Sequence, residues 1–318
     1  MTDPVVSVQQ GQLRGKTAVD YHGDTFYSFC GIPYAKAPIG ELRFKLPSKN
    51  SEKRPVMVWI YGGGFLYGSN KNELYGPNYL MTEDIVLVAI NYRLGVFGTQ
   101  ELYNAIKTSV VIRTLQVSLT TFATLSEGIF HIVYIYYVLG FLSLEDESLG
   151  VPGNAGLKDQ ALALKWIQQN IHNFGGDASN VTIFGESAGG ASVHYLTLSP
   201  LTKGLFQKAI IQSGSSLNLW ARGKKNACEV AKCFGYKDTD ETIILQKLQK
   251  ESAKNIVSSQ FKVNDDFRGS TIRPWGPVIE TKSVEAFLTE DPLDILKSGK
   301  NHQIPMIIGY NSLEGDVL

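Results

Sequence analysis

Five short apolar runs, spread along most of the chain, constrain its fold more than any other feature. They are rich in Val and Ile and lack strict polar–apolar alternation, as is typical of buried parallel strands covered on both faces. The runs are VMVWIY at 56–61, IVLVAI at 85–90, VTIF at 181–184, KAIIQ at 208–212 and IPMIIG at 304–309. Helical patterns lie between them, the clearest at 156–176, where Gly175-Gly176 predict the helix end. This alternation predicts an α/β fold with a doubly wound, mostly parallel sheet.

The length and composition favour a soluble globular chain with one large α/β domain or two small ones. The chain has 318 residues, of which 43% are hydrophobic, with 30 basic and 30 acidic side chains. The balanced charge favours neither nucleic acid nor a membrane surface as a partner. The start, MTDPVVSVQQGQLRGK, lacks the apolar core of a signal peptide, so we expect a cytoplasmic location. Cys30, Cys228 and Cys233 do not predict a disulfide framework.

Two stretches interrupt the alternating pattern. Residues 47–55 form a short polar join before the first apolar run, and residues 99–138 are rich in β-branched residues without a coherent period. The apolar run at 129–142 has a length more typical of a core element than of a membrane span. We therefore interpret 99–138 as an irregular insertion.

The segment Gly185-Glu186-Ser187-Ala188-Gly189 matches the pattern G-x-S-x-G between a predicted strand and a predicted helix. In that setting the pattern predicts a nucleophile elbow, a tight strand-to-helix turn that exposes the serine hydroxyl. The alternative is an ordinary strand-to-helix turn in which Ser187 caps the helix.

A second glycine-rich element, Gly62-Gly63-Gly64, directly follows the first apolar run. Its backbone N–H groups are suited to face the oxyanion of an acyl-transfer intermediate. The phosphate-binding patterns G-x-x-x-x-G-K-[ST] and G-x-G-x-x-G are absent from both glycine-rich elements. A plain glycine turn remains open for this element considered alone.

A catalytic serine requires an acid and a histidine. Glu314 follows the last apolar run, where ligand sites of open sheets gather, but a solvated loop glutamate fits the sequence equally well. The triad order is serine, acid, histidine, and no histidine follows Glu314. We assign none of the five histidines as the base; they are His22, His131, His172, His194 and His302. His194 lies about 10 Å along the helix axis from Ser187 and is expected to be a packed core residue.

With these motifs, the chain resembles the type B carboxylesterase and cholinesterase family of α/β-hydrolases, in particular the insect α-esterases. The matching stretches are GIPYAKAPIGELRFKLP (31–47), PVMVWIYGGGFLYGSN (55–70), VLVAINYRLGVFG (86–98), the long block at 140–200 and IIGYNSLEG (307–315). The resemblance implies one partial α/β-hydrolase domain over residues 1–318.

The resemblance also assigns roles to individual residues. It makes Ser187 the nucleophile, Glu314 the triad acid, and the backbone N–H groups of Gly63, Gly64 and Ala188 the oxyanion hole. Glu186 then borders the substrate pocket, and Tyr61 stands where many members of the family carry histidine. The implied reaction is hydrolysis of a small apolar carboxylic ester through an acyl-enzyme, without a metal or cofactor.

Three departures from the family pattern stand out. A central segment, which includes a strand, is missing between Pro47 and Pro55. Residues 99–138 have no counterpart in the family, and a translated intron is one explanation for them. The C-terminal third, with the catalytic histidine, is also missing. We therefore expect impaired activity. The alternative is a non-catalytic binding or adhesion protein, or a scaffold that sequesters ester ligands.

Overall fold

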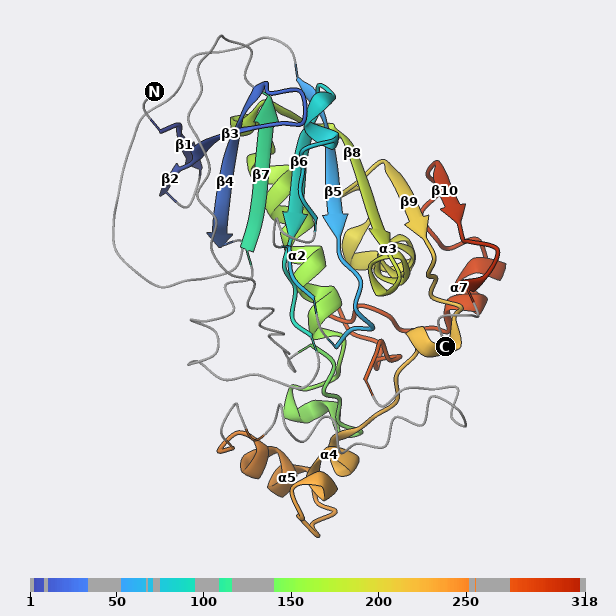
Figure 1. The fold of residues 1–318 in the computed structure, drawn as a ribbon. Coiled ribbons are helices and arrows are strands. Elements are labelled where there is room, and N and C mark those ends of the chain that lie inside the picture. The colour runs from blue at the N-terminus through green and yellow to red at the C-terminus, as the bar shows by residue number, and fades with distance from the viewer. Residues whose placement is uncertain are drawn as a thin grey trace.

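A mixed eight-stranded sheet forms the centre of the molecule (Figure 1). The computed structural model describes residues 3–8, 11–33, 53–66, 68–70, 75–94, 109–115, 140–251, 255 and 275–314. The order across the sheet is β10-β9-β8-β5-β6-β7-β4-β3. The strands are β3 (Lys16–Val19), β4 (Thr25–Pro33), β5 (Arg54–Ile60), β6 (Val86–Ile90), β7 (Ser109–Leu115), β8 (Gly176–Glu186), β9 (Lys208–Gln212) and β10 (Met306–Gly309). A separate hairpin pairs β1 (Val5–Val8) with β2 (Gly11–Arg14).

The five strands from β10 to β6 are parallel, and they correspond to the five apolar runs of the sequence. The chain adds β6 on one side of β5 and later returns to place β8 on the other side. The direction of chain growth across the sheet therefore reverses between β5 and β8. Open α/β sheets bind their ligands outside the carboxyl ends of the strands at such a switch point.

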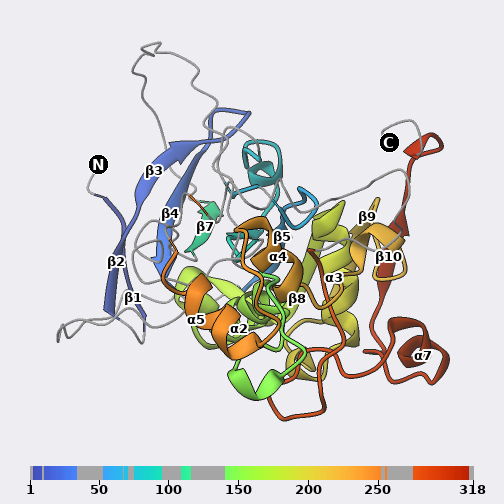
Figure 2. The same ribbon diagram turned by 90° about the horizontal axis from the view of Figure 1, so that it is seen from below.

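The α-helices gather on one side of the sheet (Figure 2). The core on that side includes Val58 from β5, Ile183 from β8, Leu164 from α2 and Val193 from α3, none of them exposed. The helices are α2 (Ala155–Asn170), α3 (Ala188–Leu198), α4 (Ala227–Cys233), α5 (Glu241–Leu248) and α7 (Pro292–Lys297), with 3-10 turns at Leu80–Thr82, Glu147–Leu149, Ile171–Phe174, Pro200–Thr202 and Leu219–Ala221. The helix expected at 156–176 is α2 with its 3-10 extension, which ends at Gly175 with φ 78°.

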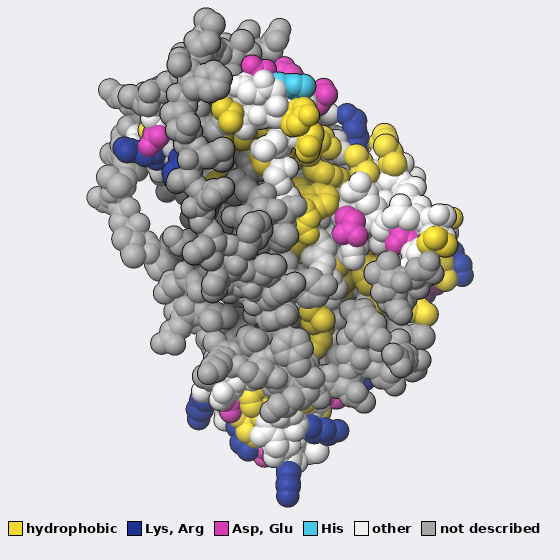
Figure 3. All heavy atoms as spheres, viewed as in Figure 1, with side chains coloured by type: hydrophobic (Ala, Val, Ile, Leu, Met, Phe, Trp, Pro, Cys, Tyr) yellow, Lys and Arg dark blue, Asp and Glu magenta, His cyan; other side chains and the backbone are white. Residues whose placement is uncertain are grey.

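The opposite face of the sheet carries only the 3-10 turn Leu80–Thr82 and its flanking loop among the described residues (Figure 2). Met81 and Ile85 pack there against Leu87 of β6 and Phe184 of β8. A band of apolar side chains remains visible over the strands on this face (Figure 3). The expectation of cover on both faces is therefore met only in part by the described residues.

The strand β7 corrects our interpretation of residues 99–138 as wholly irregular. Ser109–Leu115 lies between β6 and β4 and pairs antiparallel with both. Its Val, Ile and Thr residues favour extended structure, and sheet pairing outweighs the missing periodicity. The described sheet is consequently continuous from β10 to β3. The remainder of 99–138, and residues 47–52, lie outside the described residues.

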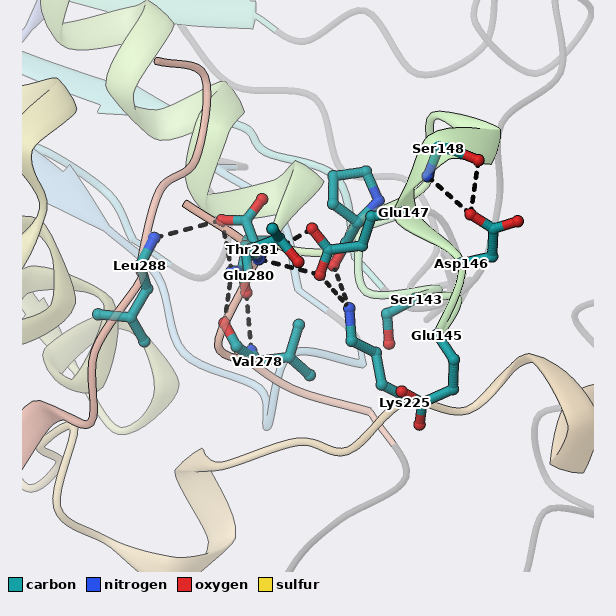
Figure 4. A network of polar contacts seen from close by, with 12 residues as sticks. Ser143, Glu145, Asp146, Glu147, Ser148, Lys225, Val278, Glu280, Thr281 and Leu288 are labelled. Atoms are coloured by element: carbon teal, nitrogen blue, oxygen red, sulfur yellow. Dashed lines mark hydrogen bonds and ion pairs between the residues drawn. The ribbon is translucent and has the colours of Figure 1, made fainter. Parts of the chain in front are cut away.

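Polar contacts fasten the segment 278–288 to the residues around α2 (Figure 4). The Glu147 carboxylate accepts hydrogen bonds from Lys225 Nζ at 2.7 Å and from the Thr281 N–H at 2.9 Å. These bonds lower the pKa of Glu147, against the opposing effect of its partial burial. The buried Glu280 carboxylate accepts from the Phe287 N–H at 2.6 Å and pairs with Lys158 at 2.5 Å. The network thus joins chain segments that are far apart in sequence.

The three cysteines are free thiols, in agreement with the absence of a disulfide framework from the sequence pattern. None of the helices in the described part of the chain has the length and apolar character needed to cross a membrane.

Candidate active site

Ser187 occupies a sharp turn between β8, which ends at Glu186, and α3, which begins at Ala188. Its backbone has φ 56° and ψ −123°, a conformation that costs a non-glycine residue roughly 1–3 kcal/mol. Two hydrogen bonds hold it there, from the Ser187 N–H to the Gln212 carbonyl and from the Ala191 N–H to the Ser187 carbonyl, each 2.9 Å. The strand–turn–helix context required by the G-x-S-x-G pattern is therefore present.

The glycines around Ser187 allow backbone segments to approach closely. A Cβ atom at Gly189 would lie 2.0 Å from the Ile60 carbonyl oxygen, so no larger residue fits without displacement of β5 or α3. A Cβ atom at Gly62 would lie 3.0 Å from the Ser187 Cβ. The glycine-rich loop after β5 and the turn after β8 are therefore in direct contact at the switch point.

Two backbone hydrogen-bond donors of this loop have no acceptor among the described residues. Gly63 and Gly64 have φ values of 110° and 62°, which glycine adopts readily. No acceptor for the N–H group of either residue lies in the described part of the chain. Ala188 is the first residue of α3, and the first N–H groups of a helix lack intrahelical acceptors. The three expected oxyanion donors thus come from the two segments that meet beside Ser187.

Glu314 lies in the loop that follows β10, and Ser187 lies in the turn that follows β8. Both residues therefore lie at the carboxyl ends of parallel strands. The Oε1 atom of Glu314 accepts a hydrogen bond of 2.8 Å from the Asn311 N–H. That bond, followed by the nearby Ser213 hydroxyl, lowers the pKa of Glu314. Ser213 follows β9, and its neighbour Gly214 packs against the Ser187 carbonyl. Glu314 is therefore linked to the Ser187 turn through the end of β9.

The Glu186 carboxylate is the second acid at this place. Partial burial, followed by the negative charge of Glu314, raises the pKa of Glu186. The two carboxyls thus have pKa values shifted in opposite directions, and each senses a different environment. Divergent acids beside a candidate nucleophile are a recurrent property of functional sites.

Tyr61 directly precedes the glycine-rich loop and holds its first residue in place. Its ring is buried and stacks on Tyr92 with 4.7 Å between centroids. The Tyr92 hydroxyl donates to the Tyr61 carbonyl at 2.8 Å, and burial raises the pKa of Tyr92 well above its usual value. This interaction fixes the last residue before Gly62 to the segment after β6.

The four described histidines lie apart from the candidate nucleophile or face other partners. His194 is buried in α3, as expected, and its Nδ1 accepts from the Ser216 N–H at 3.2 Å. His302 precedes β10 and donates from Nε2 to the Ser199 carbonyl at 3.0 Å, beyond the far end of α3. His22 and His172 are exposed in turns. His131 lies outside the described residues.

Sequence patterns missed Ser213 as a site residue. It has φ 50°, and its hydroxyl contributes to the lowered pKa of Glu314. The available signal was the run Ser213-Gly214-Ser215-Ser216 directly after an apolar strand, which is the same strand-then-small-residue pattern that identified Ser187.

The comparisons with known proteins agree on one family. The family model described as "Carboxylesterase family" matches residues 2–52, 46–104 and 131–318. Esterase B1 of Culex pipiens is 33% identical over 363 aligned positions, which cover 98% of this chain and 59% of the relative. Juvenile hormone esterase of Tribolium castaneum is 31% identical, with 98% of this chain and 55% of the relative covered.

A solved structure shows the same fold. The structure of juvenile hormone esterase from Manduca sexta, with OTFP covalently attached, superposes with a TM-score of 0.71 at 29% identity. The match covers 96% of this chain and 59% of that one, so the chain spans a little over half the length of the relatives it matches. The fold is that of the α/β-hydrolases, and the chain belongs to the carboxylesterase family.

Proposed function

We propose that the chain carries the acyl-transfer site of a carboxylic ester hydrolase, with Ser187 as the nucleophile. The observation that supports this most directly is the strained Ser187 turn in contact with a glycine loop whose N–H groups are unpaired within the described residues. The Ser187 hydroxyl oxygen attacks the ester carbonyl, and its proton passes to a base. The N–H groups of Gly63, Gly64 and Ala188 stabilise the oxyanion.

The remaining steps follow from the same arrangement. Collapse of the tetrahedral intermediate releases the alcohol, which takes up a proton, and leaves an acyl group on Ser187. Water then attacks the acyl carbonyl and releases the carboxylic acid. Glu314 acts in this proposal as the acid that orients the base, and Glu186 borders the substrate. The names of the relatives support a small carboxylic ester as substrate.

The proposal includes an impaired reaction in residues 1–318. Each described histidine is buried elsewhere, paired elsewhere or exposed in a distant turn. Ser187 then lacks an imidazole base among the described residues, and enzymes without one triad member retain roughly 10³–10⁴-fold acceleration over water. A cytoplasmic location and the nature of the 99–138 insertion stay predictions, which cell fractionation and sequencing of the transcript would test.

Labelling with a fluorophosphonate tests both parts of the proposal. The protein of residues 1–318 is incubated with the probe, with and without added imidazole, and peptide mass spectrometry follows the label. We expect slow labelling of Ser187 that imidazole accelerates, and none in Ser187→Ala. Circular dichroism confirms that both proteins are folded.

Two outcomes would contradict the proposal. Fast labelling without imidazole would show that another group activates Ser187, so that the reaction is not impaired. Absence of Ser187 labelling under both conditions, in a folded protein that still binds a non-hydrolysable ester analogue, would identify a ligand-sequestering scaffold.

A further inference from the structure

The three residues that follow β6, at 91–93, connect the glycine-rich loop to the helical layer. Arg93 attaches this segment to α2, because its guanidinium and its backbone N–H donate three hydrogen bonds of 2.7–3.0 Å to the Asp159 carboxylate. Only 3% of Asp159 is exposed. The backbone approach is also close, since a Cβ atom at Gly156 would lie 2.2 Å from the Arg93 carbonyl oxygen. Segment 91–93 is therefore held firmly against α2.

Tyr92 holds the start of the glycine-rich loop. Its hydroxyl donates to the Tyr61 carbonyl at 2.8 Å, and the Tyr61 hydroxyl donates in return to the Tyr92 carbonyl at 3.4 Å. Both rings are buried and stack on one another. Burial raises the pKa of the Tyr92 hydroxyl, so that it remains a donor at neutral pH. The carbonyl that it fixes belongs to the peptide group between Tyr61 and Gly62, where the loop begins.

Asn91 holds the far end of the same loop. Its Oδ1 accepts a hydrogen bond of 2.9 Å from the Asn70 N–H, and the Asn70 side-chain amide donates to the Ala89 carbonyl at 2.9 Å. Within the loop, the Leu66 N–H donates to the Gly63 carbonyl at 3.0 Å. The end of β6 and the residues directly after it thus hold both ends of the loop.

The position of the loop determines where its donors point. The N–H groups of Gly63 and Gly64 have no acceptor among the described residues, and the loop contacts the Ser187 turn through Gly62. Glycine has the widest choice of backbone angles, so a run of glycines does not fix its own conformation. Oxyanion donors are effective only when they are held in advance at roughly 2.7–3.1 Å from the developing charge. The attachments at both ends supply the order that the glycines lack.

We propose that Asn91 and Tyr92 are positioning residues for the acyl-transfer reaction. They hold the loop so that the N–H groups of Gly63 and Gly64 reach the oxygen of a group bound at Ser187. This role rests on the proposed function, because it concerns the same reaction. Loss of either contact should slow the reaction with a probe that offers oxygen to these donors. A probe that offers sulfur should be affected less, since sulfur is a weaker hydrogen-bond acceptor.

Two matched probes measure this difference. An alkyl fluorophosphonate, with P=O, and its phosphonothionate counterpart, with P=S, are each incubated with the protein of residues 1–318 and imidazole. The Ser187 oxygen forms a bond to phosphorus, fluoride leaves, and the proton passes to imidazole. Mass spectrometry gives the maximal labelling rate and the half-saturating concentration for each probe. Comparison of the P=O to P=S rate ratio between variant and parent cancels the intrinsic reactivity of the probes.

Two variants and one matched control separate positioning from stability. Tyr92→Phe keeps the ring and removes the donor at the start of the loop, and Asn91→Ala removes the acceptor at its far end. We expect the rate ratio to fall about tenfold in each, with unchanged half-saturating concentrations, since loss of a whole donor costs roughly 10²–10³-fold. Tyr195→Phe removes an equally buried hydroxyl that donates to the Ala221 carbonyl at 3.0 Å, and should leave the ratio unchanged.

The outcomes distinguish this role from the proposed function, once circular dichroism has shown that the variants are folded. Ser187 labelling in the parent with the same rate ratio in Tyr92→Phe and Asn91→Ala would overturn the positioning role and leave the proposed function standing. An equal loss of rate with both probes would also overturn it, because the two residues would then act on stability alone. Absence of Ser187 labelling in the parent would contradict the proposed function, and the positioning role with it.

Discussion

At Ser187, the candidate site is defined by the strained backbone conformation as well as by the hydroxyl group. The G-x-S-x-G pattern identifies the residue from sequence, because only small neighbours allow so tight a turn. The sequence could not show how Glu314 reaches this turn. That link depends on the residues after β9, where the Ser213 hydroxyl lowers the pKa of Glu314 and Gly214 packs against the Ser187 carbonyl. Long-range contacts of this kind have no local signature.

Relief of backbone strain gives a first prediction. Ser187→Gly is expected to raise the free energy of unfolding by about 1 kcal/mol, since glycine adopts φ 56° and ψ −123° with little strain. Part of the gain is offset by the greater entropy of the unfolded chain. Ser187→Ala keeps the strain and should leave stability unchanged. Urea titrations of the two variants and the parent measure the difference, and equal gains in both would contradict a strained turn.

The raised pKa of Glu186 gives a second prediction, which concerns the pH dependence of stability. Because the folded pKa of Glu186 is raised, stability falls as pH rises through the window above the unfolded value of about 4.3. Glu186→Gln should therefore be more stable than the parent above that window and equal to it below pH 4.

A carboxyl with the opposite shift serves as the control. The hydrogen bond from Lys300 lowers the pKa of Glu290, so its stabilisation is present above about pH 4.3 and is lost as pH falls through the folded pKa. Glu290→Gln should be less stable than the parent at pH 7. Urea midpoints between about pH 3 and pH 8 check both signs, and a parallel response of the two variants would refute the assignment.

At the scale of elements, the candidate site forms where the loop after β5, the end of β8 and the start of α3 meet. The five parallel strands could be predicted because buried parallel strands read as continuous apolar runs. The antiparallel strands β1 to β4 and β7 carry mixed or aperiodic patterns, and pairing with neighbours decides their structure. The candidate nucleophile and oxyanion loop follow directly from two predicted strands, which is why their positions could be inferred.

The contact of β5 with α3 gives a third prediction. Gly189→Ala places a Cβ atom 2.0 Å from the Ile60 carbonyl oxygen and should destabilise the protein by more than about 4 kcal/mol or prevent folding. Gly299→Ala is the control, because Gly299 has φ 69° with no atom near its Cβ position, and should lose only about 1–2 kcal/mol. Urea unfolding of both variants measures the difference. Similar losses would mean that the close approach is relieved by small movements.

At the scale of the molecule, buried polar contacts hold distant segments together. Glu280, almost fully buried, joins the 278–288 segment to Lys158 of α2. Nothing in the local sequence marks Glu280 as buried, since a glutamate is usually a surface residue. The resemblance to a family gave the overall fold, but contacts of this network appear only in three dimensions.

Removal of this carboxylate gives a fourth prediction. Glu280→Ala leaves Lys158 without its partner and the Phe287 N–H without an acceptor, and should lower the free energy of unfolding by about 3–5 kcal/mol. The control Glu229→Ala breaks an exposed pair with Lys224 and should lose less than about 1 kcal/mol. Chemical denaturation followed by fluorescence compares them. Equal small losses would show that the network contributes little.

The reversal of chain direction between β5 and β8 also governs when the site can appear during folding. Val58 pairs with Ile183, so the two segments that meet at Ser187 are separated by a long stretch of intervening chain. Contacts of such high sequence separation form slowly, because loop-closure entropy opposes them. A partly folded chain in which β8 has not yet docked on β5 has no elbow and no donor loop. Acquisition of Ser187 reactivity during refolding would therefore report a late step, the closure of the sheet at its centre.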